Sequence, residues 1–518
     1  MRPHMNGAES LVATLVAGGV NTCFANPGTS EMHFLAALEN PGMRSVLCLY
    51  EGIATGAADG WYRMKDEPAC TLLHLGPGLA NGLSNLHNAR RANSGIVNVI
   101  GEHSSHHLKY DAPLTSDIEG LARPLCHWVR TSDSVASVGI DAAAAVAQAR
   151  SRPGLISALI LPGETSWSEG GEPVLTHARQ AALNKPDPTL VDGIARVLLS
   201  GEPALMILAG RSLRAGTLEL AGRIAAKTGC RLASQFFSAR TERGAGRVPV
   251  ERIPYFVDAA VPFLQGVKHI ITIETGEPIA FFSYPGKPSL MKPADCVVHP
   301  FIATDEDSAG GLEMLVDAVG ARSVKPKLQA QADQGFLAGK LDPKSIALAL
   351  AAALPENAIL VDESLTTGRE SFSLTAGAAP HDQIQNMGGS IGFGTPVATG
   401  AALACPDRRV VCMVGDGSAM YTIQSLWTQA REGLNVTTLI FANNSYQILK
   451  TEYANMGVGT PGPRALSMME IDKPQIDWVA IGKGMGCPSV RVEDTEAFLK
   501  AMMNSFATQG PTLIEVAL

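Results

Sequence analysis

The chain has 518 residues, of which 46% are hydrophobic and only 17% are charged. This length suggests about three domains, and the balance is typical of large buried cores rather than of a disordered chain. The net charge is −8 and lysine and arginine form no cluster, so the sequence lacks the basic surface that nucleic acids require. We therefore expect no nucleic-acid partner.

The nine cysteines are scattered and form no C-x-x-C pair, so neither a disulfide framework nor a structural zinc site is expected. Nowhere do about 18 apolar residues follow one another, and the N-terminal residues lack the pattern of an export signal. The sequence therefore predicts a cytoplasmic protein without a membrane segment.

Helical patterns alternate with short apolar runs through most of the chain, which is typical of parallel α/β sheets. The first part ends near residue 161, and a polar segment rich in glycine and proline, residues 162–187, is predicted to be a linker. A helix is expected at residues 211–229 in the second part. The predicted strands are residues 46–50, 71–74, 95–100, 204–208, 269–274, 358–361, 410–414 and 438–441.

This order of elements predicts an α/β protein with three doubly wound parallel-sheet domains. They are expected at residues 1–170, 188–324 and 341–518. The first and third units resemble each other in kind, although no short repeat is present.

The clearest chemical motif is Gly415-Asp416-Gly417-Ser418, which ends a predicted strand and opens a helix. The N–H groups of such a helix start can bind a phosphate while Asp416 binds a divalent cation. The next predicted strand ends at Asn443. Because neighbouring parallel strands end at one edge of a sheet, Asp416, Asn443 and a turn carbonyl at Ser445 form a suitable ligand set for Mg²⁺.

A Gly-Asp-Gly sequence alone is also an ordinary turn. Together with both strands and the later asparagine, however, the segment resembles the signature of the thiamine diphosphate enzyme superfamily. The usual pair of asparagines is here Ala442-Asn443, with Asn444 one position late, so we predict Asn443 as the metal ligand. The resemblance implies thiamine diphosphate and Mg²⁺ as cofactors, held in part by Gly415, Gly417, Ser418 and Tyr446.

The resemblance also implies a catalytic glutamate in the first domain, which we assign to Glu51. Residues 51–61 match the family pattern E-x-x-A-x-x-A-A-D-G-[YW]. In the family this carboxyl group hydrogen bonds to N1′ of the aminopyrimidine and favours the imino tautomer, which removes the C2 proton of the thiazolium. The alternative is a glutamate that only stabilises the start of a helix.

A glycine-rich segment at residues 386–396 is a third match. The resemblance assigns Ile391 as the apolar side chain that bends the cofactor, and the carbonyl of Gly389 as the acceptor for its 4′-amine. A loop that merely opens a helix is compatible with the same residues. Ser364 and Thr366, at the end of a predicted strand, are expected to reach the diphosphate through their hydroxyls.

The resemblance covers essentially the whole chain, in the domain order of acetolactate synthases and benzoylformate decarboxylases. Residues 26–31 resemble the N-P-G-S-N-E segment of the decarboxylases, which places Thr29 at their substrate-contacting serine. His74 matches their active-site histidine, which can transfer protons. Their second histidine falls near Ser283, which argues against benzoylformate itself.

A group of titratable residues follows the predicted strand at residues 95–100 and is a candidate to line the substrate cavity. Histidines, which make up most of this group, are also common at protein surfaces. The group consists of Glu102, His103, His106 and His107. Their spacing matches no standard metal site. The middle unit has no dinucleotide fingerprint, so FAD is not expected.

Taken together, the resemblance implies a small 2-oxo acid substrate, decarboxylated through the thiazolium ylid and the enamine. Protonation, or addition to an aldehyde or a second oxo acid, would follow. Simple decarboxylation and acetolactate-synthase-like carboligation both remain open, as do a 2-hydroxyacyl-CoA lyase and a non-catalytic scaffold or regulatory subunit. Family members share each cofactor between two subunits, which implies at least a homodimer, and a homotetramer is the expected assembly.

Overall fold

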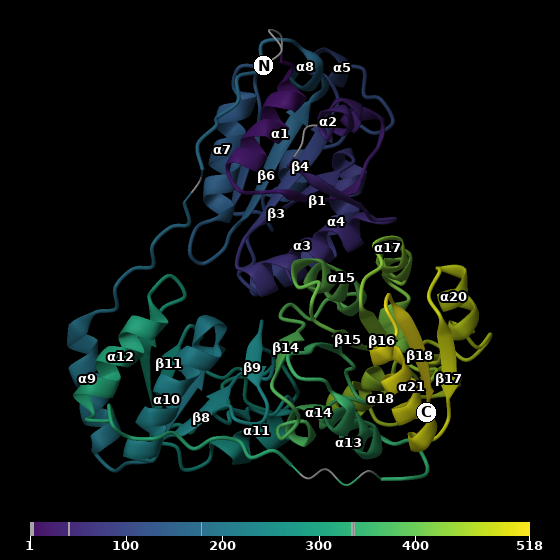
Figure 1. Cartoon of the computed structure of the whole chain (residues 1–518). Helices are drawn as coiled ribbons and strands as arrows, with labels where there is room; N and C mark the ends of the chain where they lie inside the picture. Colours follow the sequence, from purple (N-terminus) through teal and green to yellow (C-terminus); the bar gives the residue numbers. More distant parts are fainter. Residues whose placement is uncertain (1–4, 40–41, 178, 333–334, 336) are drawn as a thin grey trace.

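The computed structural model describes residues 5–39, 42–177, 179–332, 335 and 337–518. Within these residues the chain forms three β-sheets flanked by helices. Figure 1 shows the first unit in purple and blue, the middle unit in teal, and the third unit in green and yellow. The expected three-unit α/β architecture is therefore confirmed.

The first sheet has the strand order β2-β1-β3-β4-β6-β5, and all its strands are parallel. Apolar clusters cover both faces of this sheet, which explains why β4 and β6 are buried along their whole length. The strands are β1 (Thr22–Asn26), β2 (Arg44–Leu47), β3 (Ala69–Leu73), β4 (Ile96–Glu102), β5 (Trp128–Thr131) and β6 (Ile156–Pro162). The main helices are α1 (Gly7–Ala17), α3 (Glu51–Lys65), α4 (Leu75–Arg91) and α7 (Val138–Ala149).

Two sequence-based boundaries in this unit are shifted. The strand expected at residues 46–50 is β2, which starts earlier and ends at Leu47. Among the described strands it lies at the edge of the sheet and pairs with β1 alone. Its first two side chains are exposed and polar, so a search for apolar residues misses the start of the strand. The expected linker begins with helix α8 (Gly163–Trp167), and residues 170–177 and 179–183 have neither helix nor strand.

The middle sheet has the order β10-β8-β7-β11-β12 and is also parallel. The helix expected at residues 211–229 is α10 (Ala215–Thr228), which a separate turn precedes because the Ser212 hydroxyl accepts from the Ala209 N–H at 3.0 Å. The strands are β7 (Ala204–Leu208), β8 (Arg231–Ser234), β10 (Glu251–Arg252), β11 (His269–Ile273) and β12 (Val297–Ile302), and the other helices are α9 (Pro188–Leu199), α11 (Val257–Leu264) and α12 (Ser308–Ala318).

The third sheet has the order β17-β18-β16-β15-β13-β14-β9. Its last strand, β9 (Thr241–Arg243), comes from the middle part of the chain and pairs antiparallel with β14. The middle and third units are therefore joined by a shared sheet. The other strands are β13 (Ile359–Glu363), β14 (His381–Gln385), β15 (Val410–Gly415), β16 (Val436–Ala442), β17 (Ser489–Val492) and β18 (Thr512–Ala517).

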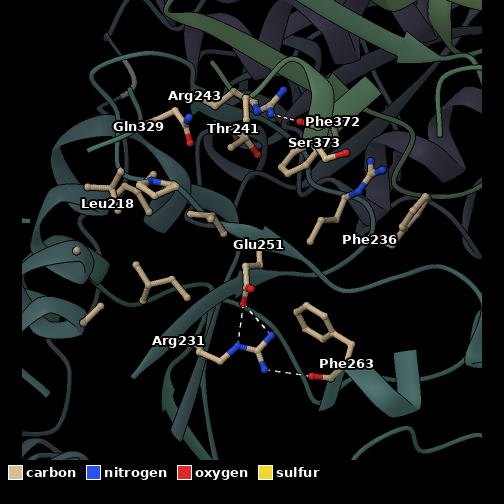
Figure 2. Close-up of a pocket in the computed structure, with 18 of the residues that line it drawn as sticks. Leu218, Arg231, Phe236, Thr241, Arg243, Glu251, Phe263, Gln329, Phe372 and Ser373 are labelled. Atoms are coloured by element: carbon tan, nitrogen blue, oxygen red, sulfur yellow. Dashed lines mark hydrogen bonds and ion pairs between the residues drawn. The ribbon is translucent and has the colours of Figure 1, made fainter. Parts of the chain in front are cut away.

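A cavity of about 910 Å³ lies beside β9, between the middle unit and helix α14 (Ser371–Leu374). Figure 2 shows Arg243 of β9 reaching across this junction toward Phe372. The buried Arg243 guanidinium donates to the Phe372 carbonyl and to the Thr375 hydroxyl, the latter at 2.8 Å. These bonds tie the two units together at their shared sheet.

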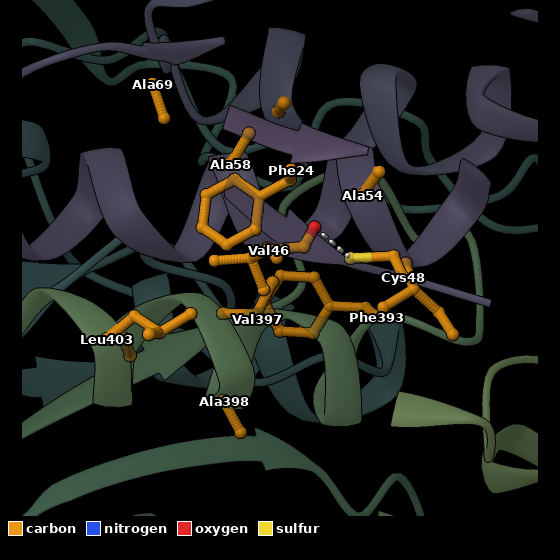
Figure 3. Packing of buried hydrophobic residues seen from close by; sticks show 14 of the residues in the cluster. Phe24, Val46, Cys48, Ala54, Ala58, Ala69, Phe393, Val397, Ala398 and Leu403 are labelled. Atoms are coloured by element: carbon orange, nitrogen blue, oxygen red, sulfur yellow. Dashed lines mark hydrogen bonds between the residues drawn. The ribbon is translucent and has the colours of Figure 1, made fainter. Parts of the chain in front are cut away.

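A close helix contact joins the first and third units. Helix α3 packs on α15 (Gly394–Ala404), and Figure 3 shows Val397 of α15 beside Phe24 and Val46 of the first sheet. A Cβ atom added to Gly60 would lie 2.1 Å from the Val397 carbonyl oxygen, and one added to Gly400 would lie 1.8 Å from that of Ala57. The two backbones therefore touch, which requires the small residues of both motifs.

Substitution of Gly400 tests this contact. Gly400→Ala places a methyl group against backbone that cannot move away, so we expect the free energy of unfolding to fall by about 3 kcal/mol. The matched control is Gly193→Ala in α9, where no heavy atom lies within 4 Å of the added carbon, and where a gain of about 1 kcal/mol is expected. Urea unfolding followed by circular dichroism measures both. Equal stability of the two variants would show that the helices can separate at no cost.

Candidate functional site

The carboxyl ends of β13, β15 and β16 meet at one edge of the third sheet, because these three strands are neighbours. Asp416 follows β15 directly and is 2% exposed. Its Oδ1 accepts from the Gly417 N–H at 2.8 Å, and its Oδ2 accepts from the Asn444 N–H at 2.6 Å. The Gly-Asp-Gly turn therefore contacts the turn after β16, and burial raises the pKa of Asp416.

The turn after β16 presents the other expected metal ligands. The Asn443 side-chain oxygen accepts from the Ser445 N–H at 3.0 Å, and the Ser445 hydroxyl donates to the Met469 carbonyl at 3.0 Å. The ring of Tyr446 packs directly on Gly417. The structure thus brings Asp416, Asn443, Ser445 and Tyr446 together, as the motif spacing predicts.

The helix expected after the Gly-Asp-Gly turn is short. Helix α16 covers only Asp416–Ala419, and a turn separates it from α17 (Ser425–Arg431). In that turn the Thr422 hydroxyl donates to the Gly392 carbonyl at 3.0 Å. Phosphate binding here would depend on the N–H groups of the turn itself, with Gly415, Gly417 and Ser418 nearest, rather than on a long helix.

A cavity of about 510 Å³ lies at this sheet edge. Gly389 and Ile391 line it, as do Ser364 and Tyr446, whereas Thr366 is not among its lining residues. Asn386 shapes the loop that carries the first two, because its side-chain oxygen accepts from the N–H groups of Gly388 at 3.2 Å and Gly389 at 2.9 Å. Four of the five expected cofactor contacts outside the Gly-Asp-Gly turn therefore face one space.

Glu363 is a cavity residue that the sequence analysis did not single out. Its carboxylate lies at the end of β13 and accepts from the N–H groups of Phe393 at 3.1 Å and Gly394 at 2.7 Å. Burial raises the pKa of Glu363 to about 7, and the backbone donors oppose this shift. An acidic residue before a glycine-rich loop was visible in the sequence, but its partners are 30 or more residues away.

Glu51 stands at the start of α3 and is 6% exposed. Its carboxylate accepts from the Asn81 amide at 3.0 Å. One helical turn further along α4, the Asn85 amide donates to the Gly52 carbonyl at 2.8 Å and to the Gly392 carbonyl at 3.1 Å. A row of asparagines therefore connects Glu51 to the loop of Ile391, although Glu51 is not among the residues that line the cavity.

His74 precedes α4 and is held by a residue that sequence reasoning missed. Its Nδ1 lies 2.8 Å from a carboxylate oxygen of the buried Glu31, which also accepts from the Gly28 N–H. Because a carboxylate only accepts, this contact places a proton on Nδ1 and leaves Nε2 available. Burial raises the pKa of Glu31. Thr29 lies in the same segment with an exposed side chain.

The titratable residues at and after the end of β4 lie outside the cavity, and His103 among them lies near His74. Glu102 is buried and accepts from the His103 N–H at 2.6 Å. Burial, and then the charges of His107 and His74, lower the pKa of His103. His106 and His107 are exposed, and none of the four residues lines the cavity. The described residues contain no group of three or more His, Cys, Asp or Glu side chains arranged to hold a metal.

The middle unit contributes an aromatic wall to the cavity. Phe281 and Phe282 lie beside Ser283, where the decarboxylases' second histidine was expected to fall, and their ring centroids are 4.9 Å apart. Phe237 meets Phe281 edge-on at 5.8 Å, and Tyr255 lies 5.4 Å from the same ring. These loops are far apart in the sequence, so only the fold reveals the wall.

Comparison with known proteins agrees with this geometry. The family models for the N-terminal and the C-terminal TPP binding domains of thiamine pyrophosphate enzymes match residues 5–121 and 372–516. "Putative acetolactate synthase large subunit IlvX" of Mycobacterium tuberculosis is 49% identical, over 99% of both chains. The chain belongs to the thiamine pyrophosphate enzyme family. Thiamine pyrophosphate is thiamine diphosphate, so the expected family, enzyme class and organic cofactor are confirmed.

Two more distant relatives agree with this assignment. Benzoylformate decarboxylase of Pseudomonas aeruginosa is 28% identical, over 96% of both chains. The solved structure of a thiamine diphosphate-dependent 4-hydroxybenzoylformate decarboxylase from Rhodococcus jostii superposes with a TM-score of 0.83, at 24% identity over 99% of both chains. This superposition shows the three-unit fold of the family enzyme. No helix among the described residues is long and apolar enough to cross a membrane.

The raised pKa of Glu363 predicts a pH dependence of stability. Between about pH 4.5 and pH 7 the folded chain binds a proton at Glu363 that the unfolded chain has released, so stability falls as the pH rises through this window. Glu363→Gln cannot titrate. The stability of the native chain relative to Glu363→Gln should therefore decrease by about 3 kcal/mol from pH 4.5 to above pH 7. Urea unfolding at a series of pH values measures this, and parallel curves for the two proteins would contradict it.

Proposed function

We propose that this thiamine pyrophosphate enzyme decarboxylates a small 2-oxo acid and uses Mg²⁺ with its organic cofactor. The observation that carries the proposal is the contact between Asp416 and the Asn443-Asn444 turn, beside the cavity that Gly389 and Ile391 line. Relatives named as decarboxylases and as acetolactate synthases support the reaction class.

The residues at this edge fit the cofactor. Asp416 is a buried carboxylate whose pKa is raised by burial, and a bound cation would stabilise its charged form. Asp416, the Asn443 side-chain oxygen and the Ser445 carbonyl would bind Mg²⁺, a hard ion that prefers oxygen ligands. The cavity volume of about 510 Å³ is within the usual range for small-molecule sites. The diphosphate would be held by Gly415, Gly417, Ser418, Ser364 and Thr366.

The cofactor, when bound, supplies a nucleophilic carbon and accepts the electron pair that CO₂ leaves behind. Glu51 would hold the proton that is exchanged with N1′ of the aminopyrimidine, with its carboxylate oriented by Asn81. The Gly389 carbonyl would accept from the 4′-amine, and the Ile391 side chain would pack against the cofactor. Glu31 fixes the tautomer of His74, so that Nε2 can transfer a proton to or from the substrate, beside Thr29.

The fate of the acyl group is the second part of the proposal. The similarity to the acetolactate synthase homologue of Mycobacterium tuberculosis favours transfer to a second oxo acid or an aldehyde, and the similarity to benzoylformate decarboxylase favours release as an aldehyde. A single panel of 2-oxo acids, with and without aldehyde acceptors, distinguishes these products by mass spectrometry.

The function is tested by CO₂ release from this panel. We expect release to require both thiamine diphosphate and Mg²⁺, and Asp416→Ala to weaken cofactor binding by about 100-fold or more, because a direct metal ligand is lost. Isothermal calorimetry measures the binding. Asn444→Gly is the matched control, because it keeps the N–H that donates to Asp416 and glycine tolerates the φ of +55°.

Two results would contradict the proposal. Absence of CO₂ release from every 2-oxo acid by the cofactor-loaded enzyme would refute the reaction. Equal losses in Asn443→Ala and Asn444→Gly would refute the choice of Asn443 as the ligand, because only the first removes the proposed side-chain oxygen.

We further propose that each site is completed by a second copy of the chain. Glu51 and Asp416 carry the two halves of the proposed chemistry, and neither lines the cavity of its own chain. Large apolar side chains remain exposed on both halves: Leu49 beside Glu51, and Met420 and Tyr421 beside the Gly-Asp-Gly turn. A symmetric dimer would cover both surfaces and create two sites.

Mixed dimers test this arrangement. Glu51→Gln and Asp416→Ala chains, each inactive alone, are co-expressed with different tags. Random pairing makes about half of the dimers mixed, and in each of these one site carries both changes while the other carries neither, so roughly a quarter of the native activity should return. Background activity in purified mixed dimers would show that each site is contained in one chain.

A further inference from the structure

The cavity beside β9, called the junction cavity below, has no part in the proposed function. Its volume of about 910 Å³ exceeds that of the cavity lined by Gly389 and Ile391, and it is within the usual range for small-molecule sites. Its walls include residues of α10, β10, α11 and α14, so it lies at the edge of the middle sheet where the third unit packs (Figure 2). The junction cavity is therefore a candidate for a second ligand site.

One wall of the junction cavity is aliphatic. Its residues on α10 are Leu218, Gly222, Ala225 and Ala226, and Val248 and Val250 complete it. From Leu218 to Ala226 the wall runs about 12 Å along the helix axis. Leu218 and Val248 also belong to the core of the middle unit. The wall is therefore held in place and can pack against an alkyl chain, because its side chains contain no hydrogen-bonding group.

A second wall alternates aromatic rings with guanidinium groups. The Arg252 guanidinium lies 4.3 Å from the ring centroid of Phe236 and 4.7 Å from that of Phe372, and the Arg243 guanidinium lies 4.0 Å from the latter. Such contacts are attractive because the face of an aromatic ring is partly negative. The rings are thus engaged by cations, and this wall offers positive charge rather than an open stacking surface.

Arg243 and Arg252 donate only to uncharged acceptors among the described residues. Arg252 donates to the Arg369 carbonyl at 2.7 Å. Arg243, which is 6% exposed, has four uncharged partners. They are the Thr375 hydroxyl at 2.8 Å, the Gln383 side-chain oxygen at 3.0 Å, the Phe372 carbonyl, and the ring of His381, whose pKa is lowered to about 4 by burial. Dipoles therefore solvate these two cations, but no carboxylate of the described residues is bonded to either.

One carboxylate is shared by both groups. The charge of Asp362 attracts Arg243 and Arg252 alike, while its oxygens accept hydrogen bonds from other groups. Burial, and then the charge of Arg252, lower the pKa of Arg243 to about 9, and burial lowers that of Arg252 to about 10. Arg369 faces the charge of Glu452 and adds repulsion at Arg252. Two neighbouring guanidinium groups thus have one carboxylate between them, which leaves an excess of positive charge.

The acidic residues of the junction cavity do not remove this excess. Glu251 pairs with Arg231, whose Nε lies 2.9 Å from its carboxylate, as the dashed lines in Figure 2 show. Glu242 pairs with Arg240 at 3.0 Å. The exposed Lys327 adds a further cation to the lining. An anionic ligand would therefore meet more positive than negative charge.

We propose that the junction cavity binds an organic anion, with its carboxylate or phosphate head group at Arg252 and an aliphatic body along α10. The guanidinium donors that lack a carboxylate suit an anionic oxygen, and bonds of this kind are stronger than those between neutral groups. The aliphatic wall suits an alkyl chain, and the engaged rings argue against a stacked base. This site is separate from the proposed reaction, although Arg252 lines both cavities.

Isothermal calorimetry with the cofactor-loaded native enzyme tests the class of ligand. The probes are octanoate and octyl phosphate, with octanamide as the neutral compound of the same chain length. At least one anion should bind about 10-fold or more tightly than octanamide, because it adds a hydrogen bond between charged groups, and the tighter anion identifies the head group. Absence of binding by both anions, equal binding of octanamide, or tighter binding of octylamine or adenosine monophosphate would overturn the inference.

Substitutions that fill the junction cavity test the location. Ala225→Phe and Ala226→Trp should each weaken binding of the anion about 10-fold or more, because both residues line this cavity and not the one beside Gly389. The matched control is Ala507→Trp, an exposed alanine at the end of α21 (Thr495–Ala507) and outside both cavities, which should leave the affinity unchanged. Native affinity in both filled variants, with folding confirmed by circular dichroism, would overturn the inference.

Substitution of Arg252 tests the role of charge. Arg252→Gln should reduce the preference for the anion over octanamide to about one, whereas Arg252→Lys should retain part of it. This ratio separates charge recognition from a structural role, because a distorted cavity would weaken both probes together. An unchanged ratio in Arg252→Gln would overturn the inference. These measurements need no turnover, so their outcome does not depend on whether any 2-oxo acid is decarboxylated.

Discussion

Backbone contact between α3 and α15 is the constraint that sets how each chain presents its two motifs, and therefore how two copies can share the proposed sites. Glu51 is the first residue of α3, and the loop that carries Gly389 and Ile391 leads directly into α15. Gly60 and Gly400 allow the two helices to touch, so the position of one motif fixes that of the other. The small residues that follow Glu51 in its sequence motif are therefore packing residues.

Buried polar bonds then fix the angle between these units. The Asp59 and Arg63 side chains form an ion pair at 2.7 Å, with both side chains nearly inaccessible, and Arg63 also donates to the Gln385 carbonyl at 2.6 Å. A buried pair stabilises little by itself, because desolvation offsets the attraction, but its hydrogen bonds are directional. The pair thus connects α3 of the first unit to the end of β14, where the loop that carries Gly389 and Ile391 begins. These charges therefore contribute more to the relative position of the two units than to the stability of the fold.

Sequence reasoning succeeded where function depends on local order along the chain. The spacing from Asp416 to Asn443 reflects two adjacent parallel strands, which any reader of the sequence can infer, and the structure joins their turns through the Asn444 N–H. Sequence reasoning failed where the hydrogen-bond or strand partners lie far apart in the sequence. Glu31 meets His74, and Glu363 meets Gly394, only through the fold, and β9 is a polar three-residue strand recruited by another unit. Periodicity and motif spacing carry no information about such contacts.

The sheet edge of the cavity and its aromatic wall differ in how freely their residues can be substituted. Residues assigned to the cofactor follow buried strands, so substitutions there disturb the sheet edge as well as the chemistry. The aromatic wall comes from loops of the middle unit, and beside it lies α18 (Gln447–Asn455), a helix with no buried residue. Because this wall contributes little to any core, its side chains can vary without loss of the fold. Relatives that share one cofactor site can therefore differ in substrate, and selectivity is best sought in α18 and the aromatic loops.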